Sequence, residues 1–377
     1  FVLTGLKSML IPQAMILSIA GGLFLTNFLA KTGLFWLTGM VKQERIRDWG
    51  IIAKNSTMLI FFGVFIFALI GMPPFPSFFS KWNLIGILAL NQQWIIIAVI
   101  LTGSLLEVAY LLRWFGYAVK GSDEAADNEI RPVSMTRQLS VLMMASALLA
   151  AAVLWFLGYG FTLPFIPVEL QLISLLPLIG LAVFRILDFL PNKPKGLLVI
   201  ASLTGWGILS FRTGQLELST LFGLILVGAA IIQVFSWLRH TDKQCGLYPL
   251  LVMLILAMGN LVKASNNLEF FLSWEFMTIA SYLLVLRGKN SRQPALSYIL
   301  FSMAGAYLIL TGLALVPGLI SINPGLSSWS FDRFSLVGLI LLAIGFLIKT
   351  GALFVHTWLP GTYSEAEDDF TTMLSSV

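Results

Sequence analysis

The sequence has few of the residues that build disulfides and metal centres. Its 377 residues include one cysteine, Cys245, and two histidines, His240 and His356. One cysteine cannot form a disulfide within the chain, and it excludes zinc or iron–sulfur clusters held by several cysteines. No phosphate-binding loop or nucleophile elbow is present either. We therefore expect no cofactor and no metal, and any redox chemistry would belong to partner subunits.

Charge is scarce as well. Charged residues make up 11% of the chain and hydrophobic residues 58%, whereas an ordinary soluble domain has roughly 25% and 45–50%. A water-soluble fold of this length could not bury so much apolar surface. The composition therefore predicts an all-α, polytopic protein of the lipid bilayer, and the net charge of +5 does not favour nucleic-acid binding.

Apolar segments of about 17–25 residues predict transmembrane helices. About twelve occur, at residues 11–40, 55–71, 76–90, 93–117, 139–159, 171–190, 196–211, 217–238, 247–265, 268–286, 294–316 and 334–356. The loop 120–137 and the stretch 161–167 flank one span and mark the best boundary between two parts, 1–160 and 161–377. Because the chain begins at Phe1 without a methionine, we expect a fragment or a processed chain.

Basic residues of the loops predict an orientation. Beyond residue 170, one set of alternating loops carries most of them: Lys193, Lys195, Arg239, Lys243, Arg287, Lys289 and Arg292. Cytoplasmic loops are enriched in lysine and arginine, so this set is predicted to face the cytoplasm. The basic loop 41–54 does not fit simple alternation. Either a span is miscounted there or that segment lies along the membrane interface.

Ionisable residues deep in spans are rare and usually functional. The candidates are Lys31, Lys81, Glu107, Glu275 and Lys349. Lys349 lies deep in the segment 334–356, too far from either end for its amine to reach water easily. Burial disfavours a charged amine, so such a lysine can bind and release a proton near neutral pH. Glu275 is the natural partner of Lys349, as part of a switch or as a structural ion pair.

The other candidates each allow two interpretations. Lys81 follows GMPPFPSFFS, whose three prolines prevent a continuous helix, so it lines a hydrated path or begins a helix at the surface. Asn27 shares a helix face with Lys31. Glu107, Tyr110 and Arg113 also share a face, as a structural network or a proton outlet.

Two further spacings are interpreted as structural. Arg185 and Asp188 are expected to form a local pair at the interface. Gly345 and Gly351 are predicted to be helix-packing positions.

The stretch KTGALFVHTWLPGTYSEAEDD resembles the seventh-helix signature of the antiporter-like membrane subunits of respiratory complex I, membrane-bound hydrogenases and Mrp-type cation/proton antiporters. In this resemblance Lys349 matches the pumping lysine and His356 the histidine. The stretch NNLEFFLSWEFMTIASYLLV resembles the fifth helix, with Glu275 as its glutamate, and ALSYILFSMAGAYLILTGLAL resembles the sixth. Residues 366–369 depart from the usual Ala-Pro.

The first part resembles the second half of such a module. NFLAKTGLFWLTG places Lys31 at the family's lysine and Asn27 where a histidine is usual. GMPPFPSFFSKWNL places Lys81 at the charged residue of a broken helix, and EVAYLLRWF resembles the helix that follows it. The resemblance implies the C-terminal part of one module in 1–160 and the N-terminal part of another in 161–377. It also implies inverted repeats with broken helices.

The leading hypothesis is a proton-translocating, antiporter-like subunit in a bacterial or archaeal cell membrane, assembled with other membrane subunits. Lys31, Lys81, Glu275, Lys349 and His356 would carry the protons. One alternative is an Mrp-type subunit that moves sodium against protons. Another is a non-transporting scaffold for a redox or other soluble partner.

Overall fold

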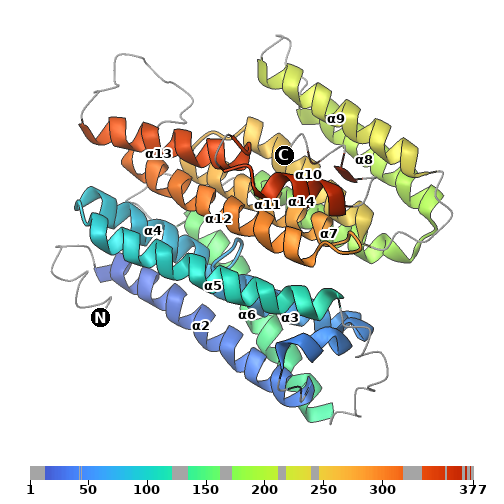
Figure 1. Ribbon diagram of the computed structural model, residues 1–377, viewed down its shortest axis with the longest axis horizontal. Helices are drawn as coiled ribbons and strands as arrows, with labels where there is room; N and C mark the ends of the chain where they lie inside the picture. The colour runs from blue at the N-terminus through green and yellow to red at the C-terminus, as the bar shows by residue number, and fades with distance from the viewer. Residues whose placement is uncertain are drawn as a thin grey trace. The chain divides into compact units, whose positions relative to one another are not determined.

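The computed structural model describes residues 13–41, 43, 45–120, 135–161, 172–210, 218–238, 246–316, 333–352, 355–366, 370–371 and 374. Within these ranges the regular elements are helices, without a strand (Figure 1). The chain divides into two compact units. Unit 1 comprises Phe1–Glu169, Met303–Val316 and Phe331–Leu347, and unit 2 comprises Leu170–Ser302, Pro317–Ser330 and Ile348–Val377. Most of the predicted boundary, in 120–137 and 161–167, lies outside the described residues, as do His240 and Cys245.

Unit 1 is built mainly from the first part of the chain. Its elements are α2 (Gln13–Val41), the 3-10 helix η1 (Ile46–Lys54), α3 (Ser56–Ile70), α4 (Pro76–Leu90), α5 (Trp94–Lys120) and α6 (Met135–Phe161). Helix α2 packs against α3, α4 and α6. The contact with α4 is so close that a Cβ at Gly22 would strike the Ser80 hydroxyl.

The chain breaks between α3 and α4, as the three prolines predict. Helix α3 ends at Gly71, whose φ of 83° is the left-handed conformation that favours glycine. Helix α4 then begins with Pro76 in its first turn, where a missing N–H costs nothing. The Ser77 hydroxyl donates to the carbonyl of Ala68 at 2.8 Å across the break. This arrangement leaves irregular backbone beside Lys81.

The segment 41–54 contains the 3-10 helix η1. Trp49 and Ile52 of η1 are buried, and η1 packs against α5 and α3. The Trp49 ring contacts Trp114 of α5 edge-on, with ring centroids 4.6 Å apart, and lies 5.1 Å from Phe62 of α3. This segment is therefore a packed amphipathic element rather than a simple loop.

Unit 2 contains η3 (Leu172–Leu175), α7 (Leu176–Ile186), η4 (Leu187–Phe189), α8 (Asn192–Ser210), α9 (Leu218–Trp237), α10 (Leu247–Val262), α11 (Asn267–Val285) and α14 (Trp358–Glu365). Helix α10 lies at its centre and packs against α7, α8, α9 and α11. Helix α11 is also buried almost all round, on both its apolar and its polar positions. A polar residue on α11 is therefore enclosed by protein.

Helices α12 (Arg292–Leu315) and α13 (Arg333–Lys349) contribute residues to both units. Within unit 1 they pack through glycines. A Cβ added at Gly345 would lie 2.7 Å from the carbonyl oxygen of Gly305, and one at Gly312 would lie 2.8 Å from that of Gly338. Small residues allow such close backbone approach in membrane helices. Gly345 is thus a packing position, as predicted.

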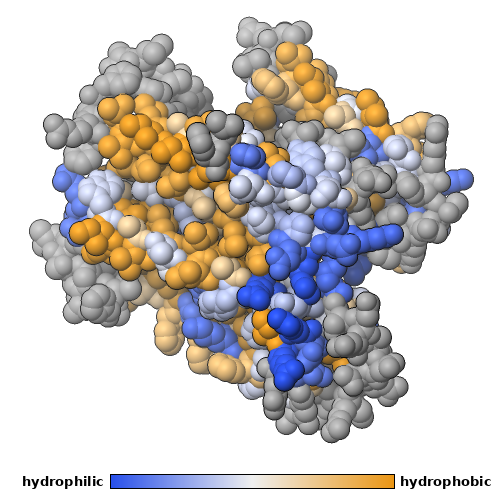
Figure 2. Space-filling model, viewed as in Figure 1, coloured by the Kyte–Doolittle hydropathy of each residue, from blue (hydrophilic) through white to orange (hydrophobic). Residues whose placement is uncertain are grey.

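Among the described residues, six helices are long and apolar enough to cross a membrane, by length and composition: Met15–Val41, Trp94–Lys120, Gln138–Trp155, Ser219–Trp237, Asn267–Val285 and Arg292–Leu315. Three shorter apolar helices accompany them. Large hydrophobic side chains are strongly exposed, including Ile95 at 82% and Leu209 at 78%, and they cover much of the visible face in Figure 2. The protein is an all-helical, multi-pass membrane protein; the number of about twelve spans stays a prediction.

Candidate functional site

A helix break places Lys349 at the end of α13. The predicted span 334–356 was wrong at this point, because the helix stops at Lys349 and α14 begins at Trp358. Gly351 has a φ of 65° and forms the turn, where any Cβ would strike Leu359. Gly351 is therefore a turn residue and not the predicted helix-packing position. A helix C-terminus carries partial negative charge, which favours a cation there.

The Lys349 side chain is buried in unit 2 with 5% of its surface exposed. Its amine donates to the hydroxyl of Tyr298 at 2.6 Å and to the hydroxyl of Ser302 at 3.3 Å. Tyr298 and Ser302 lie four residues apart on α12, so they occupy one helix face. The amine also lies 4.6 Å from the Tyr298 ring centroid. The buried Lys349 amine is thus held by neutral hydroxyl groups.

A second group of contacts holds Tyr298 in place. Its hydroxyl lies 2.6 Å from that of Ser281 on α11, and Ser281 donates to the carbonyl of Met277 at 2.8 Å. The Trp358 ring packs edge-on against the Tyr298 ring, with centroids 5.2 Å apart. The indole N–H of Trp358 donates to the carbonyl of Ile348 at 3.3 Å. Helices α11, α12, α13 and α14 therefore meet at Lys349.

Glu275 and His356 differ in their surroundings. Glu275 is 3% exposed on α11, on the same helix as Ser281. Thr278 lies between them in sequence and is fully buried. His356 is exposed in the connection between α13 and α14. The hydrogen bonds described for Lys349 lead to α12, and the partnership of Lys349 with Glu275 stays a prediction.

Unit 1 brings together three of the other predicted residues. The Lys81 amine donates to the carbonyl of Ile70 at 2.9 Å, at the end of α3, and lies 5.8 Å from the ring centroid of Tyr307. The Glu107 carboxylate on α5 interacts electrostatically with Lys81 and, more weakly, with Lys31 on α2. Helices α2, α4 and α5 thus place two amines within electrostatic range of the Glu107 carboxylate.

The remaining residues of unit 1 lie nearer its surface. Lys31, Tyr110 and Arg113 are exposed, and Glu107 is half-buried. Asn27 is half-buried, and its amide donates to the carbonyl of Leu23 in its own helix at 3.0 Å.

Comparison with known proteins identifies the region around Lys349. Residues 264–377 match the family described as NADH:quinone oxidoreductase/Mrp antiporter, TM. They contain Glu275, Ser281, Tyr298 and Lys349, so the buried lysine and its hydroxyl partners all lie in the part of the chain that the family covers.

Curated relatives of the chain carry the name NADH-quinone oxidoreductase subunit N. The protein from Trichlorobacter lovleyi is 26% identical over 54% of this chain and 48% of its own length. The one from Symbiobacterium thermophilum is 26% identical over 55% of this chain and 50% of its own length. Subunit N 2 of Acidobacterium capsulatum is 31% identical over 44% of this chain and 36% of its own length. The chain thus spans about half, or less, of the length of these relatives.

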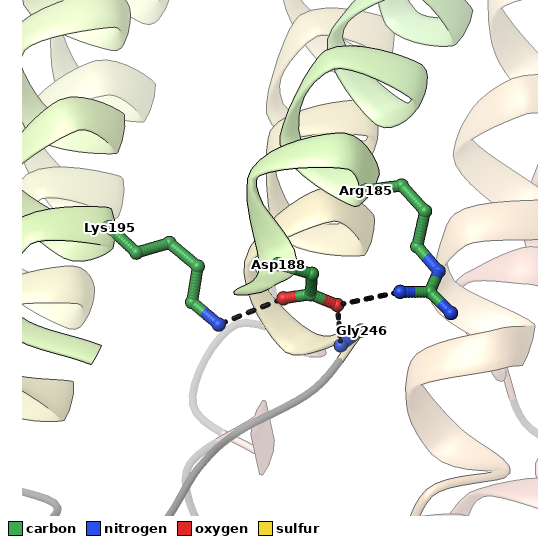
Figure 3. Close-up of polar contacts among 4 residues, drawn as sticks. All are labelled: Arg185, Asp188, Lys195 and Gly246. Atoms are coloured by element: carbon green, nitrogen blue, oxygen red, sulfur yellow. Dashed lines mark hydrogen bonds and ion pairs between the residues drawn. The ribbon is translucent and has the colours of Figure 1, made fainter. Parts of the chain in front are cut away.

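A buried charged cluster before the antiporter-family region was missed by sequence reasoning. Figure 3 shows Asp188 between Lys195, Arg185 and the backbone of Gly246. The Lys195 amine lies 2.8 Å from the Asp188 carboxylate, and the Gly246 N–H donates to it at 2.7 Å. Lys195 is fully buried and Asp188 is 3% exposed. Lys195 was expected to lie in a loop, because it follows Pro194 and a short polar run.

The expected local pair of Arg185 and Asp188 is part of this cluster. That pair exists at 3.4 Å, but the Arg185 side chain is 47% exposed. The dominant partner of Asp188 is the buried Lys195, which reaches it from the start of α8 and also lies 5.0 Å from the Tyr248 ring centroid. Asp188 therefore connects the end of α7 to the starts of α8 and α10.

Proposed function

We propose that the protein is a proton-translocating, antiporter-like subunit of a multisubunit complex in a bacterial or archaeal cell membrane. The observation that carries this proposal is the Lys349 amine, buried at a helix break and bonded to neutral hydroxyls. Ionisable side chains buried in a membrane segment are rare and are usually functional. The match of residues 264–377 to the antiporter family and the names of the relatives support the same function.

In this proposal Lys349 and Glu275 form the switch of one module. Moving the Glu275 carboxylate toward or away from Lys349 changes how firmly the amine holds its proton. His356, exposed in the connection to α14, links Lys349 to the aqueous phase. Lys31 and Lys81 serve as relay and outlet in the first part, with Glu107 within range of both. Asn27, Tyr110 and Arg113 belong to the same network.

We further propose that residues 1–160 are the C-terminal part of one antiporter-like module and 161–377 the N-terminal part of another, each with inverted repeats. The match of 264–377 to the family falls inside the second range. The helix breaks between α3 and α4 in the first range and between α13 and α14 in the second support this division, since the resemblance implies a broken helix in each repeat.

Replacement of Lys349 by Met tests this function. Membrane vesicles containing the assembled complex should lose proton uptake down to the level of vesicles without the protein, because no titratable amine remains at the break. Lys289→Met is the matched control, since Lys289 is exposed in the turn between α11 and α12. Uptake at the original rate in Lys349→Met vesicles would refute the proposal.

A second candidate is a sodium/proton antiporter subunit, because the matched family includes Mrp antiporters. The same vesicles distinguish the two. Proton movement that requires a sodium gradient, in the absence of any electron donor, supports the antiporter. Proton movement that requires electron transfer supports a redox-driven complex. A scaffold without transport predicts unchanged flux in Lys349→Met.

A further inference from the structure

The hydrogen bonds around Lys349 have a direction. A charged lysine donates three hydrogen bonds and accepts none, so the Tyr298 oxygen must accept from Lys349. The hydrogen of the Tyr298 hydroxyl then points to its other partner, the Ser281 oxygen at 2.6 Å. Ser281 in turn donates to the carbonyl of Met277. The chain runs from Lys349 through Tyr298 and Ser281 to the backbone of α11.

The same atoms allow the opposite direction. A neutral amine has a lone pair and accepts a hydrogen bond. The Tyr298 hydrogen can then turn toward Lys349, and the Ser281 hydrogen can turn toward Tyr298, because either oxygen of this pair can be the donor. Only hydroxyl rotations are needed, and no heavy atom moves. The carbonyl of Met277 then loses the Ser281 hydroxyl as a donor, but as a helix carbonyl it already accepts a backbone hydrogen bond within α11.

We propose that Tyr298 and Ser281 are positioning residues whose hydroxyl groups reverse direction whenever Lys349 gains or loses its proton. This inference rests on the proposed function of Lys349. A buried polar group without a partner is costly, so a lysine held only by acceptors would keep its proton. The hydroxyl pair satisfies both forms of the amine. Trp358 holds the Tyr298 ring, so the two oxygens stay within 2.6 Å of their partners.

Tyr298→Phe is the sharpest test. It removes one oxygen and keeps the ring that packs against Trp358. The charged amine loses its shortest hydrogen bond, so Lys349 holds its proton less firmly. The pH of half-maximal proton uptake should therefore move to lower pH, by about one to two units if the bond has the strength usual for a charged group. The matched control is Thr311→Val, which removes a buried hydroxyl of α12 that bonds only its own helix at Tyr307.

Ser281→Ala should shift the profile in the same direction by less, because Tyr298 keeps its oxygen but loses its acceptor. Other ionisable groups on the surrounding elements are Glu269, Glu275 and Tyr282 on α11, Arg292 and Tyr307 on α12, Arg333 on α13, His356 before α14, and Tyr363 and Glu365 on α14. All of them are unchanged in these variants. Their titration is therefore common to every profile, and the difference between profiles belongs to the hydroxyl groups.

The outcomes separate the inference from the function. If Lys349→Met abolishes uptake but Tyr298→Phe and Ser281→Ala keep the original pH profile, the hydroxyl pair has no such role and the inference is overturned. If Lys349→Met takes up protons normally, the proposed function itself fails. Should Tyr298→Phe not assemble, Ser281→Ala decides alone: a shifted profile supports the inference and an unshifted one overturns it.

Discussion

At the scale of single residues, two buried lysines of unit 2 are stabilised by different chemistry. Lys195 faces the carboxylate of Asp188, which favours only the ammonium form. Lys349 faces the hydroxyls of Tyr298 and Ser302, which can serve both forms of an amine. Lys195 therefore suits a fixed structural charge, and Lys349 suits a charge that changes. Burial alone does not separate them, since both are almost inaccessible.

We expect Asp188→Asn to destabilise the protein by about 3–5 kcal/mol, because it leaves the Lys195 ammonium buried without its counter-charge. Thermal unfolding in detergent measures this loss. Arg185→Met is the control, with an expected effect below about 1 kcal/mol, since that side chain is 47% exposed and its pair is long. The double variant Asp188→Asn/Lys195→Met should recover part of the loss. Equal stability of Asp188→Asn and the parent would contradict a structural role for the pair.

At the scale of elements, hydropathy predicted most helices well. The segment 76–90 coincides with α4, and 294–316 differs from α12 by two residues at one end and one at the other. The end of α13 was not predictable in this way. Apolar residues continue beyond Lys349, and the stop depends on the left-handed turn at Gly351, which composition does not reveal. A glycine in an apolar run suits a turn and a packing contact equally.

The candidate site was predicted only in part. Lys349 and Glu275 were predicted because both are ionisable residues in apolar surroundings. The motif resemblance then pointed to the same two residues. Tyr298, Ser302 and Ser281 carry no charge, and they lie 47 to 68 positions away from Lys349 in sequence. Their contact depends on how α11, α12 and α13 pack. No pattern within a single segment of the sequence predicts it. Lys195 was missed for the same reason, since its partner Asp188 reaches it only through the turn between η4 and α8.

Glycine contacts between α12 and α13 give a prediction for helix packing. Gly345→Ala should destabilise the protein by about 1–3 kcal/mol, because its Cβ would lie 2.7 Å from the Gly305 carbonyl oxygen. Gly103→Ala in α5 is the control, where nothing lies within 4 Å of an added Cβ. There the better helix propensity of alanine should stabilise by up to about 1 kcal/mol. Opposite signs in thermal unfolding are expected, and a neutral Gly345→Ala would show that α12 and α13 are not in close contact.

At the scale of the whole molecule, the predicted orientation has a direct test along α11. This helix runs from the turn at 263–266 to the turn at 286–291, so as a membrane span it would place these two turns on opposite sides of the membrane. Arg287 and Lys289 belong to the loop set predicted to be cytoplasmic. The chain contains one cysteine, so Cys245→Ser gives a background without any reactive thiol.

In that background, Asn290→Cys should react with a membrane-impermeant maleimide in inside-out vesicles and not in intact cells. Ala264→Cys should show the reverse. Ala280→Cys, fully buried in α11, should stay unlabelled in both. Labelling of both turns from the same side would exclude α11 as a span, and a reversed pattern would place the basic loops outside.

Trp358 gives the break after Lys349 a mechanical character. Its indole N–H donates to the carbonyl of Ile348 in α13, and its ring packs edge-on with the Tyr298 ring of α12. A displacement of α14 would therefore act on the Tyr298 ring and on the backbone next to Lys349 together. Because the Tyr298 hydroxyl holds the Lys349 amine, a movement that begins in the exposed connection at His356 would reach the buried nitrogen through one aromatic contact.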